Sequence, residues 1–334
     1  MSQASLAATN PALGPPHTRL RVHLGLFGLT VVTTTVAGMG MATAALPLFD
    51  RVRVGLGFSL TLLGILLTHE MGHYVFARLH RVDTSLPYVI PGPPLLTMGT
   101  FGAVIRMRSP IPTRDALIDI GASGPIAGLI VALPLLALGL LWSPVVASPT
   151  ADHSFWVGNQ TLLSLAREAL AHLQAHLAHL PPPLATPRHD TALGDNLLMR
   201  GMTRLILGPL APGHDIRIHP VGMAAWFGLL VTSLNLFPIG QLDGGHVSYA
   251  MLGERGHRWL SHAASFGLLA LACFSSVSWL LWWVVTRYFL GFSHPPLQRE
   301  LGAGGKVGGL RTAIAVVSLL LLIATLIPVP MDQV

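Results

Sequence analysis

Six long apolar segments constrain the fold of this chain more than any other feature. Of its 334 residues, 51% are hydrophobic and only 10% are charged, whereas soluble domains carry about 25% charged residues. The sequence therefore predicts an all-α polytopic membrane protein. A helix of about 20 apolar residues can cross a bilayer, and segments of about that length or longer lie at residues 22–48, 55–79, 117–142, 221–239, 259–290 and 311–329.

The segments around these spans divide the chain into three regions. Residues 1–21 are rich in alanine and proline and are expected to form a disordered tail. Residues 22–252 are expected to form a membrane core that carries an extramembrane loop at 143–220, and residues 253–334 are expected to add C-terminal transmembrane helices. The net charge is +6, but no nucleic-acid recognition motif accompanies it, so no nucleic-acid partner is expected.

Two short elements are predicted between the spans. Residues 99–108 are β-rich and partly alternating, which predicts a small membrane-associated strand or hairpin between the second and third spans; the alternative is a plain connecting loop. Residues 161–180 show the apolar stripe of an amphipathic helix. Its other face carries His172, His176 and His179, which are either metal ligands or part of a solvated polar face.

Two histidines and a carboxylate lie inside the second predicted span, in the sequence His69-Glu70-Met71-Gly72-His73. Polar groups are costly at membrane depth and usually have a function there. Positions i and i+4 share one face of a helix, so His69 and His73 can bind one metal ion, with Glu70 beside them as a general base. The alternative is a structural helix that carries these residues by chance.

Asp243 is the best candidate for a third metal ligand. It follows the fourth span directly, after Pro238 and Gly240, which interrupt the helix. The second and fourth predicted spans run in the same direction, so Asp243 arrives at the depth of His69 and His73. The alternative is that Asp243 caps the helix beginning near Gly244.

The chain resembles the site-2 protease family of intramembrane zinc metalloproteases, peptidase family M50. The matching pieces are HEMGH, GASGP at residues 121–125 and NLFPIGQLDGGH at residues 235–246, in the order of that family. The resemblance implies one Zn²⁺ per chain, held by His69, His73 and Asp243. It also implies that Glu70 is the catalytic base and that Asn235 lies near the substrate carbonyl.

The resemblance further implies a substrate, a membrane and an orientation. The expected activity is cleavage of transmembrane segments of membrane proteins within the lipid bilayer, as in regulated intramembrane proteolysis. The expected substrates include anti-sigma factors and membrane-tethered transcription factors. The expected location is the inner membrane of a bacterial cell, with the active site nearer the cytoplasmic face.

Two other functions remain open at the level of the sequence. Residues 121–124 match the GxSG signature of rhomboid serine proteases, which would make Ser123 a nucleophile, although small residues here also suit close helix packing. The 16 histidines alternatively suggest a membrane zinc transporter or sensor. A transporter needs polar groups along a path, whereas the intramembrane polar groups here are concentrated at one depth.

Overall fold

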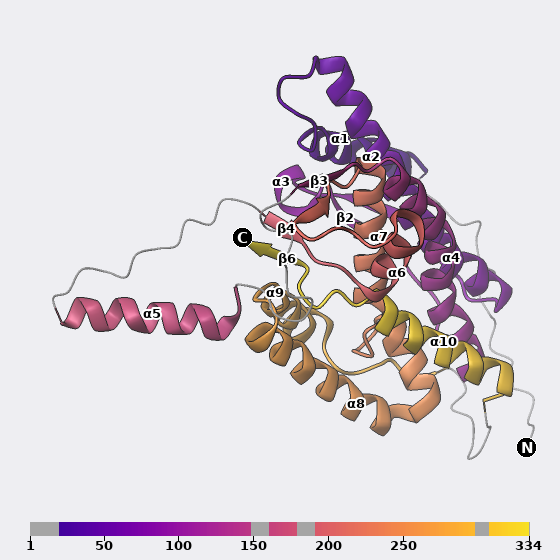
Figure 1. Ribbon diagram of the computed structural model, residues 1–334. Coiled ribbons are helices and arrows are strands. Elements are labelled where there is room, and N and C mark those ends of the chain that lie inside the picture. The colour runs from indigo at the N-terminus through magenta and orange to yellow at the C-terminus, as the bar shows by residue number, and fades with distance from the viewer. Residues whose placement is uncertain (1–19, 148–159, 179–190, 298–306, 334) are drawn as a thin grey trace, which may run out of the picture.

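The computed structural model describes residues 20–147, 160–178, 191–297 and 307–333, and these are mostly helical (Figure 1). Three helices are long and apolar enough to cross a membrane by length and composition: α1 (Leu20–Met39), α2 (Leu48–Leu79) and α4 (Arg114–Leu141). Two shorter apolar helices are α7 (Pro220–Leu236) and α10 (Gly309–Thr325). The helical membrane architecture is thus confirmed, whereas six transmembrane helices are not.

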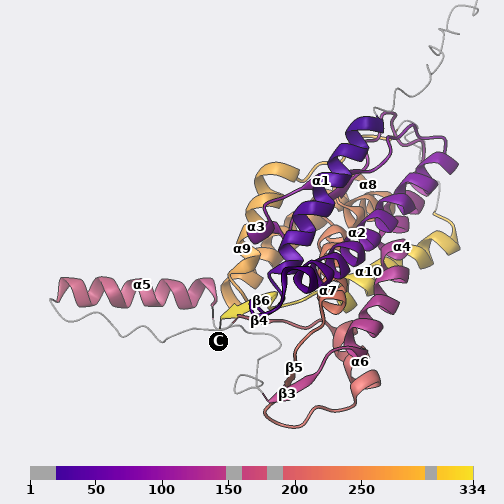
Figure 2. The same cartoon turned by 90° about the horizontal axis from the view of Figure 1, so that it is seen from above.

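The centre of the bundle is formed by α2, α4 and α7, which pack against one another (Figure 2). Ile65, Leu136 and Leu229 contribute one fully buried apolar side chain from each helix to a shared core. The helices α4 and α7 approach especially closely, because a Cβ on Gly139 would lie 2.2 Å from the Cα of Gly222. This close packing fixes the relative position of the three helices that surround the site described below.

The predicted strand at residues 99–108 is present as part of a hairpin. β2 (Thr100–Val104) pairs antiparallel with β1 (Tyr88–Pro91), and the short helix α3 (Pro94–Thr97) connects them. The hairpin is anchored on α1, where the Thr33 hydroxyl donates to the Gly99 carbonyl at 2.6 Å. The prediction of a small β element between the second and third spans is confirmed.

The single span predicted at residues 259–290 is wrong. The structure has α8 (Asp243–Phe274), which bends at Gly253, followed by α9 (Ser278–Val285) and a short π-helix, η1 (Thr286–Leu290). The backbone N–H groups of Ser275 and Ser276 both donate to the Leu271 carbonyl, and the Ser275 hydroxyl donates to the Pro328 carbonyl. These contacts end α8 between two apolar stretches that read as one in the sequence.

The first predicted span also ends early. The helix α1 stops at Met39 instead of continuing to residue 48, and residues 40–46 form turns in which Gly40 and Met41 donate to Ala37 and Gly38. Pro47 then immediately precedes α2. Of the predicted disordered tail, only Leu20 and Arg21 are described, and both belong to α1.

The predicted extramembrane loop contains short elements around the ends of α4 and α7. β3 (Val145–Ala147) pairs with β5 (His214–Ile216), and β4 (Thr191–Leu193) pairs with β6 (Met331–Gln333). The helix α6 (Leu197–Leu207) follows β4. The helix α5 (Leu162–Leu177) begins at the Thr161 capping box and projects away from the bundle in both views (Figures 1 and 2).

Candidate metal centre

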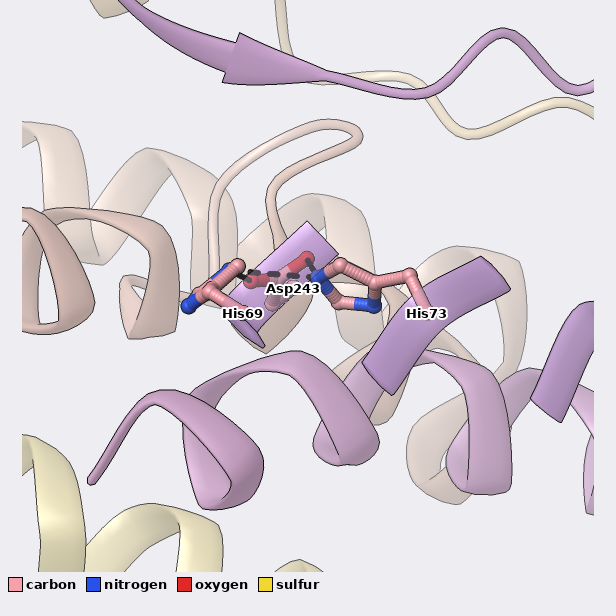
Figure 3. Close-up of side chains that lie close together, drawn as sticks. All are labelled: His69, His73 and Asp243. Carbon is pink, nitrogen blue, oxygen red and sulfur yellow. Dashed lines mark hydrogen bonds and ion pairs between the residues drawn. The ribbon is translucent and has the colours of Figure 1, made fainter. Parts of the chain in front are cut away.

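Two histidines from α2 and an aspartate from α8 meet inside the bundle, with Asp243 between the two imidazoles (Figure 3). His69 Nε2 lies 3.2 Å from Asp243 Oδ2, and His73 Nε2 lies 3.2 Å from Asp243 Oδ1. The two Nε2 atoms are also 3.2 Å apart. Among the described residues, this is the group of His, Cys, Asp and Glu side chains whose donor atoms suit one metal ion.

The spacing of the donor atoms on these three side chains fits a zinc ion. Bonds of about 2.0–2.1 Å in a tetrahedral site place neighbouring ligand atoms about 3.3 Å apart. The three separations of 3.2 Å agree with that value. Two imidazole nitrogens and a carboxylate oxygen also leave a fourth position open, which is typical of catalytic rather than structural zinc sites.

A second hydrogen bond fixes the orientation of His73. Its Nδ1 lies 2.7 Å from the carbonyl oxygen of Ile120 in α4, which can only accept. Nδ1 therefore carries the proton, and Nε2 presents its lone pair to the centre. Metal-binding histidines commonly donate their other N–H in this way, which fixes the tautomer and the plane of the ring.

Glycines on α4 make room for both imidazoles. A Cβ on Gly124 would lie 2.1 Å from His73 Nε2, and a Cβ on Gly128 would lie 3.3 Å from His69 Nδ1. One turn before Gly124, a Cβ on Gly121 would lie 2.8 Å from the Cβ of His246 in α8. The small residues of GASGP thus allow α4 to pack closely against both helices that carry the ligands.

The local backbone explains how Asp243 reaches the histidines. The helix α7 ends at Leu236, and α8 begins at Asp243 after a turn in which Gly240 has φ +52°. A Cβ on Gly244 would lie 1.9 Å from the Leu236 carbonyl oxygen, so glycine is required for this tight reversal. The Asp243 side chain contacts the histidines, and the first turn of α8 has no side-chain cap.

Glu70 and Asn235 border the same centre. Glu70 is 7% exposed, and its carboxylate interacts with the backbone of Ile105, the residue directly after β2. Asn235 lies near the end of α7, and its Nδ2 is 3.3 Å from His69 Nε2. The structure therefore brings together all five residues that the sequence singled out: His69, Glu70, His73, Asn235 and Asp243.

Ser123 is poorly placed to act as a nucleophile. Its hydroxyl donates to the carbonyl of Ile120 in its own helix at 2.8 Å, and no hydrogen bond joins it to a histidine within the described chain. A serine nucleophile needs such a base. His172 and His176 are exposed on α5 and form no described metal group, and His179 lies outside the described residues.

Sequence reasoning missed a pair of histidines beside the centre. His246 Nδ1 in α8 lies 2.7 Å from Nε2 of His294, and the His294 ring stacks on Tyr249. His294 follows η1, far from His246 along the chain, and no spacing rule connects the two positions. Both histidines line a cleft of about 700 Å³ next to the metal centre.

Comparison with known proteins places the site in a family. The model of peptidase family M50 matches residues 57–276, which include all five site residues. A protein of Arabidopsis thaliana described as probable zinc metalloprotease EGY1, chloroplastic, is 30% identical over 84% of this chain and 44% of its own length. A rice protein described as probable zinc metalloprotease EGY2, chloroplastic, is 28% identical over 72% of this chain and 38% of its own length.

This chain spans about half or less of the length of these relatives. No solved structure matches it. The family model nevertheless covers well over half of the chain, and its span contains both the HEMGH helix and the Asp243 turn. The chain therefore belongs to peptidase family M50, the family that its paired motifs resemble.

Proposed function

We propose that the protein is a zinc-dependent endopeptidase that cuts the membrane-spanning segments of other membrane proteins. One zinc ion per chain would be held by His69, His73 and Asp243. The observation that supports this most directly is the convergence of three side chains inside the bundle: the two imidazole Nε2 atoms lie 3.2 Å apart, and each lies 3.2 Å from one carboxylate oxygen of Asp243. Membership of a peptidase family and the description of the relatives as probable zinc metalloproteases favour hydrolysis over metal transport.

The proposed chemistry is hydrolysis of a peptide bond. Zinc in such a site supplies Lewis acidity, which makes water more acidic and polarises a carbonyl. The Glu70 carboxylate accepts the proton of the attacking water and later delivers it to the nitrogen of the leaving amine. Asn235 Nδ2 donates a hydrogen bond to the oxyanion that develops on the substrate carbonyl.

The free edge of β2 is suited to holding an unwound substrate. The backbone N–H groups of Arg106 and Arg108 donate to Ser85 Oγ and to the Asp83 carbonyl, on the side of β1. Because N–H groups alternate between the two edges of a strand, the N–H of Ile105 points the other way, toward Glu70. An extended substrate can pair with this edge through backbone hydrogen bonds.

The membrane setting follows from the fold and the family. The chain is an integral membrane protein, and its substrates would be membrane proteins. We propose that residues 22–252 form the catalytic core, that residues 253–334 flank it, and that the site lies nearer the cytoplasmic face. The expectation of a bacterial inner membrane gains no support, because the relatives are described as chloroplastic. Anti-sigma factors and tethered transcription factors remain the proposed substrate class.

Purified protein in lipid nanodiscs provides the test. Single-span test proteins would be added, and the cleavage position would be read by mass spectrometry. We expect cuts within the membrane segment that stop when a chelator removes the metal and return when zinc is added. Cleavage that persists after the metal is removed, or cuts only outside the membrane segment, would contradict the proposal. Comparing the membrane proteomes of wild-type and Glu70→Gln cells would then identify natural substrates.

A further inference from the structure

A cleft of about 700 Å³ lies directly beside the metal centre. Gln241 and His246 in its wall lie two residues before and three residues after Asp243. Ile105, which also lines the cleft, is the residue whose backbone interacts with the Glu70 carboxylate. A polypeptide bound at the metal centre would therefore continue into this cleft.

The charge of the cleft comes from two arginines. Arg106 and Arg108 are both exposed and both line it, whereas Met107 between them packs against the apolar core. Within the described part of the chain, neither arginine forms an ion pair, and none of the residues that line the cleft is acidic. The cleft is thus basic, without an internal carboxylate to balance it.

The histidines of the cleft contribute little to this charge at neutral pH. Burial lowers the pKa of His294 below its ordinary value, and hydrogen bonding to the Pro295 carbonyl opposes this only in part. His294 is therefore neutral near pH 7. Its Nε2 lies within hydrogen-bond distance of His246 Nδ1, at 2.7 Å. The hydrogen-bonded pair lines the cleft and does not add a second charged group to it.

The two arginines are carried on a fixed segment of backbone. Arg106 N donates to Ser85 Oγ at 2.9 Å, and Ser85 N donates to the Arg106 carbonyl at 3.0 Å. Arg108 N donates to the Asp83 carbonyl at 2.8 Å. The segment directly follows β2 and begins with Ile105, whose backbone interacts with the Glu70 carboxylate. Both arginines therefore lie on the path of a substrate paired with that strand.

We propose that this cleft binds an acidic segment of the substrate that flanks the scissile bond, and that Arg106 and Arg108 pair with its carboxylates. The inference rests on the proposed function and deepens it, because it names a chemical feature of the substrate. Arginine suits this task, since its planar fork binds carboxylates with two parallel hydrogen bonds. A basic flank would be rejected by like-charge repulsion, so the same pair selects against Lys- and Arg-flanked membrane segments.

Binding to the Glu70→Gln protein tests the inference without requiring cleavage. The protein would be placed in nanodiscs of uncharged lipid and titrated with labelled single-span peptides. The peptides would be identical except for a short flank of glutamates, glutamines or lysines. We expect the glutamate flank to bind roughly tenfold more tightly than the glutamine flank, as two exposed ion pairs allow, and the lysine flank to bind most weakly. Salt should reduce this difference.

Charge reversal supplies the decisive comparison. Arg106→Glu/Arg108→Glu should invert the order, so that the lysine flank binds best, whereas Arg106→Gln/Arg108→Gln should remove the preference. The matched control is Arg204→Glu, an exposed arginine on α6 outside the cleft, which should leave the order unchanged. Unchanged zinc content in each variant would exclude a general loss of structure.

Three results would overturn the inference. These are equal affinity for the three flanks, an order that survives charge reversal, and no binding of the glutamate-flanked peptide at all. A parallel titration in nanodiscs that contain anionic lipid tests the other source of negative charge: peptide binding that requires the anionic lipid and does not depend on the flank would show that the arginines bind lipid headgroups, which also overturns the inference. Ordered binding of the peptides without cleavage by the wild-type protein would contradict the proposed function but not the acidic-segment site.

Discussion

Gly124 leaves the space that the His73 imidazole occupies. A Cβ at position 124 would lie 2.1 Å from Nε2 and 2.5 Å from Cδ2 and Cε1 of that ring. The hydrogen bond from His73 Nδ1 to the Ile120 carbonyl comes from the preceding turn of the same helix. The helix α4 thus positions the His73 ring in two ways. The Ile120 carbonyl accepts its hydrogen bond, and position 124 has no room for a side chain larger than that of glycine.

We therefore expect Gly124→Ala to weaken zinc binding. The added methyl group must displace the His73 ring, and disturbing the support of a metal ligand typically costs about 10–100-fold in metal affinity. Competition with a fluorescent chelator would measure the effect. Gly64→Ala on α2 is the matched control, because a Cβ there meets no atom within 4 Å. Equal zinc affinity in the two variants would show that the ring can shift without cost.

The zinc content of histidine variants provides a second prediction. We expect one zinc per wild-type chain and close to none in His69→Ala/His73→Ala, because the remaining carboxylate cannot hold the ion alone. The chain offers a matched pair on α5, where His172 and His176 are also four residues apart but exposed. Metal analysis of purified protein should show that His172→Ala/His176→Ala retains the zinc. The opposite result would move the site to α5.

Glu70→Gln separates proton transfer from metal binding. Glutamine has nearly the same shape as glutamate but cannot accept the proton, so cleavage should fall by about 10²–10⁴-fold while zinc content and thermal stability stay unchanged. Cleavage of a single-span test protein would be the measurement, with the exposed Glu254→Gln as control. A rate within a few-fold of wild type would remove Glu70 from the mechanism.

The sequence predicted the residues of the centre because two simple rules applied. Helical periodicity places His69 and His73 on one face, and the direction of the spans brings Asp243 to the same depth. The sequence pattern alone did not show whether Asp243 is a metal ligand or a helix cap. That choice depends on the turn between α7 and α8, where Gly240 and Gly244 set the direction of the chain.

Other features depended on contacts between distant parts of the chain. Asp119 in α4 binds Arg311 at the start of α10 through two guanidinium nitrogens and also contacts His80, which couples the C-terminal helix to the core. The spacing of these residues along the sequence does not predict this network. The break between α8 and α9 was missed for the same reason, since Ser275 is fixed by Pro328, which lies much later in the sequence.

The free edge of β2 provides the last prediction. Successive backbone N–H groups of a strand point to opposite edges. The N–H group of Arg106 points to Ser85, and the N–H group of Ile105 therefore points to the side of Glu70. Ile105→Pro removes this N–H without touching the hairpin side, whereas Ile105→Ala keeps it. Val104→Pro removes a group on the β1 side instead.

Peptide binding separates substrate pairing from an effect on Glu70. Because Ile105 also contacts Glu70, the Ile105 variants should be compared in the Glu70→Gln background. We expect Ile105→Pro to weaken binding of a single-span peptide by about fivefold, which corresponds to one lost hydrogen bond, and Ile105→Ala to bind nearly as wild type. Val104→Pro should instead lower thermal stability by opening the hairpin. If Ile105→Pro binds peptide normally, or loses its zinc, the edge of β2 supports the site but does not hold the substrate.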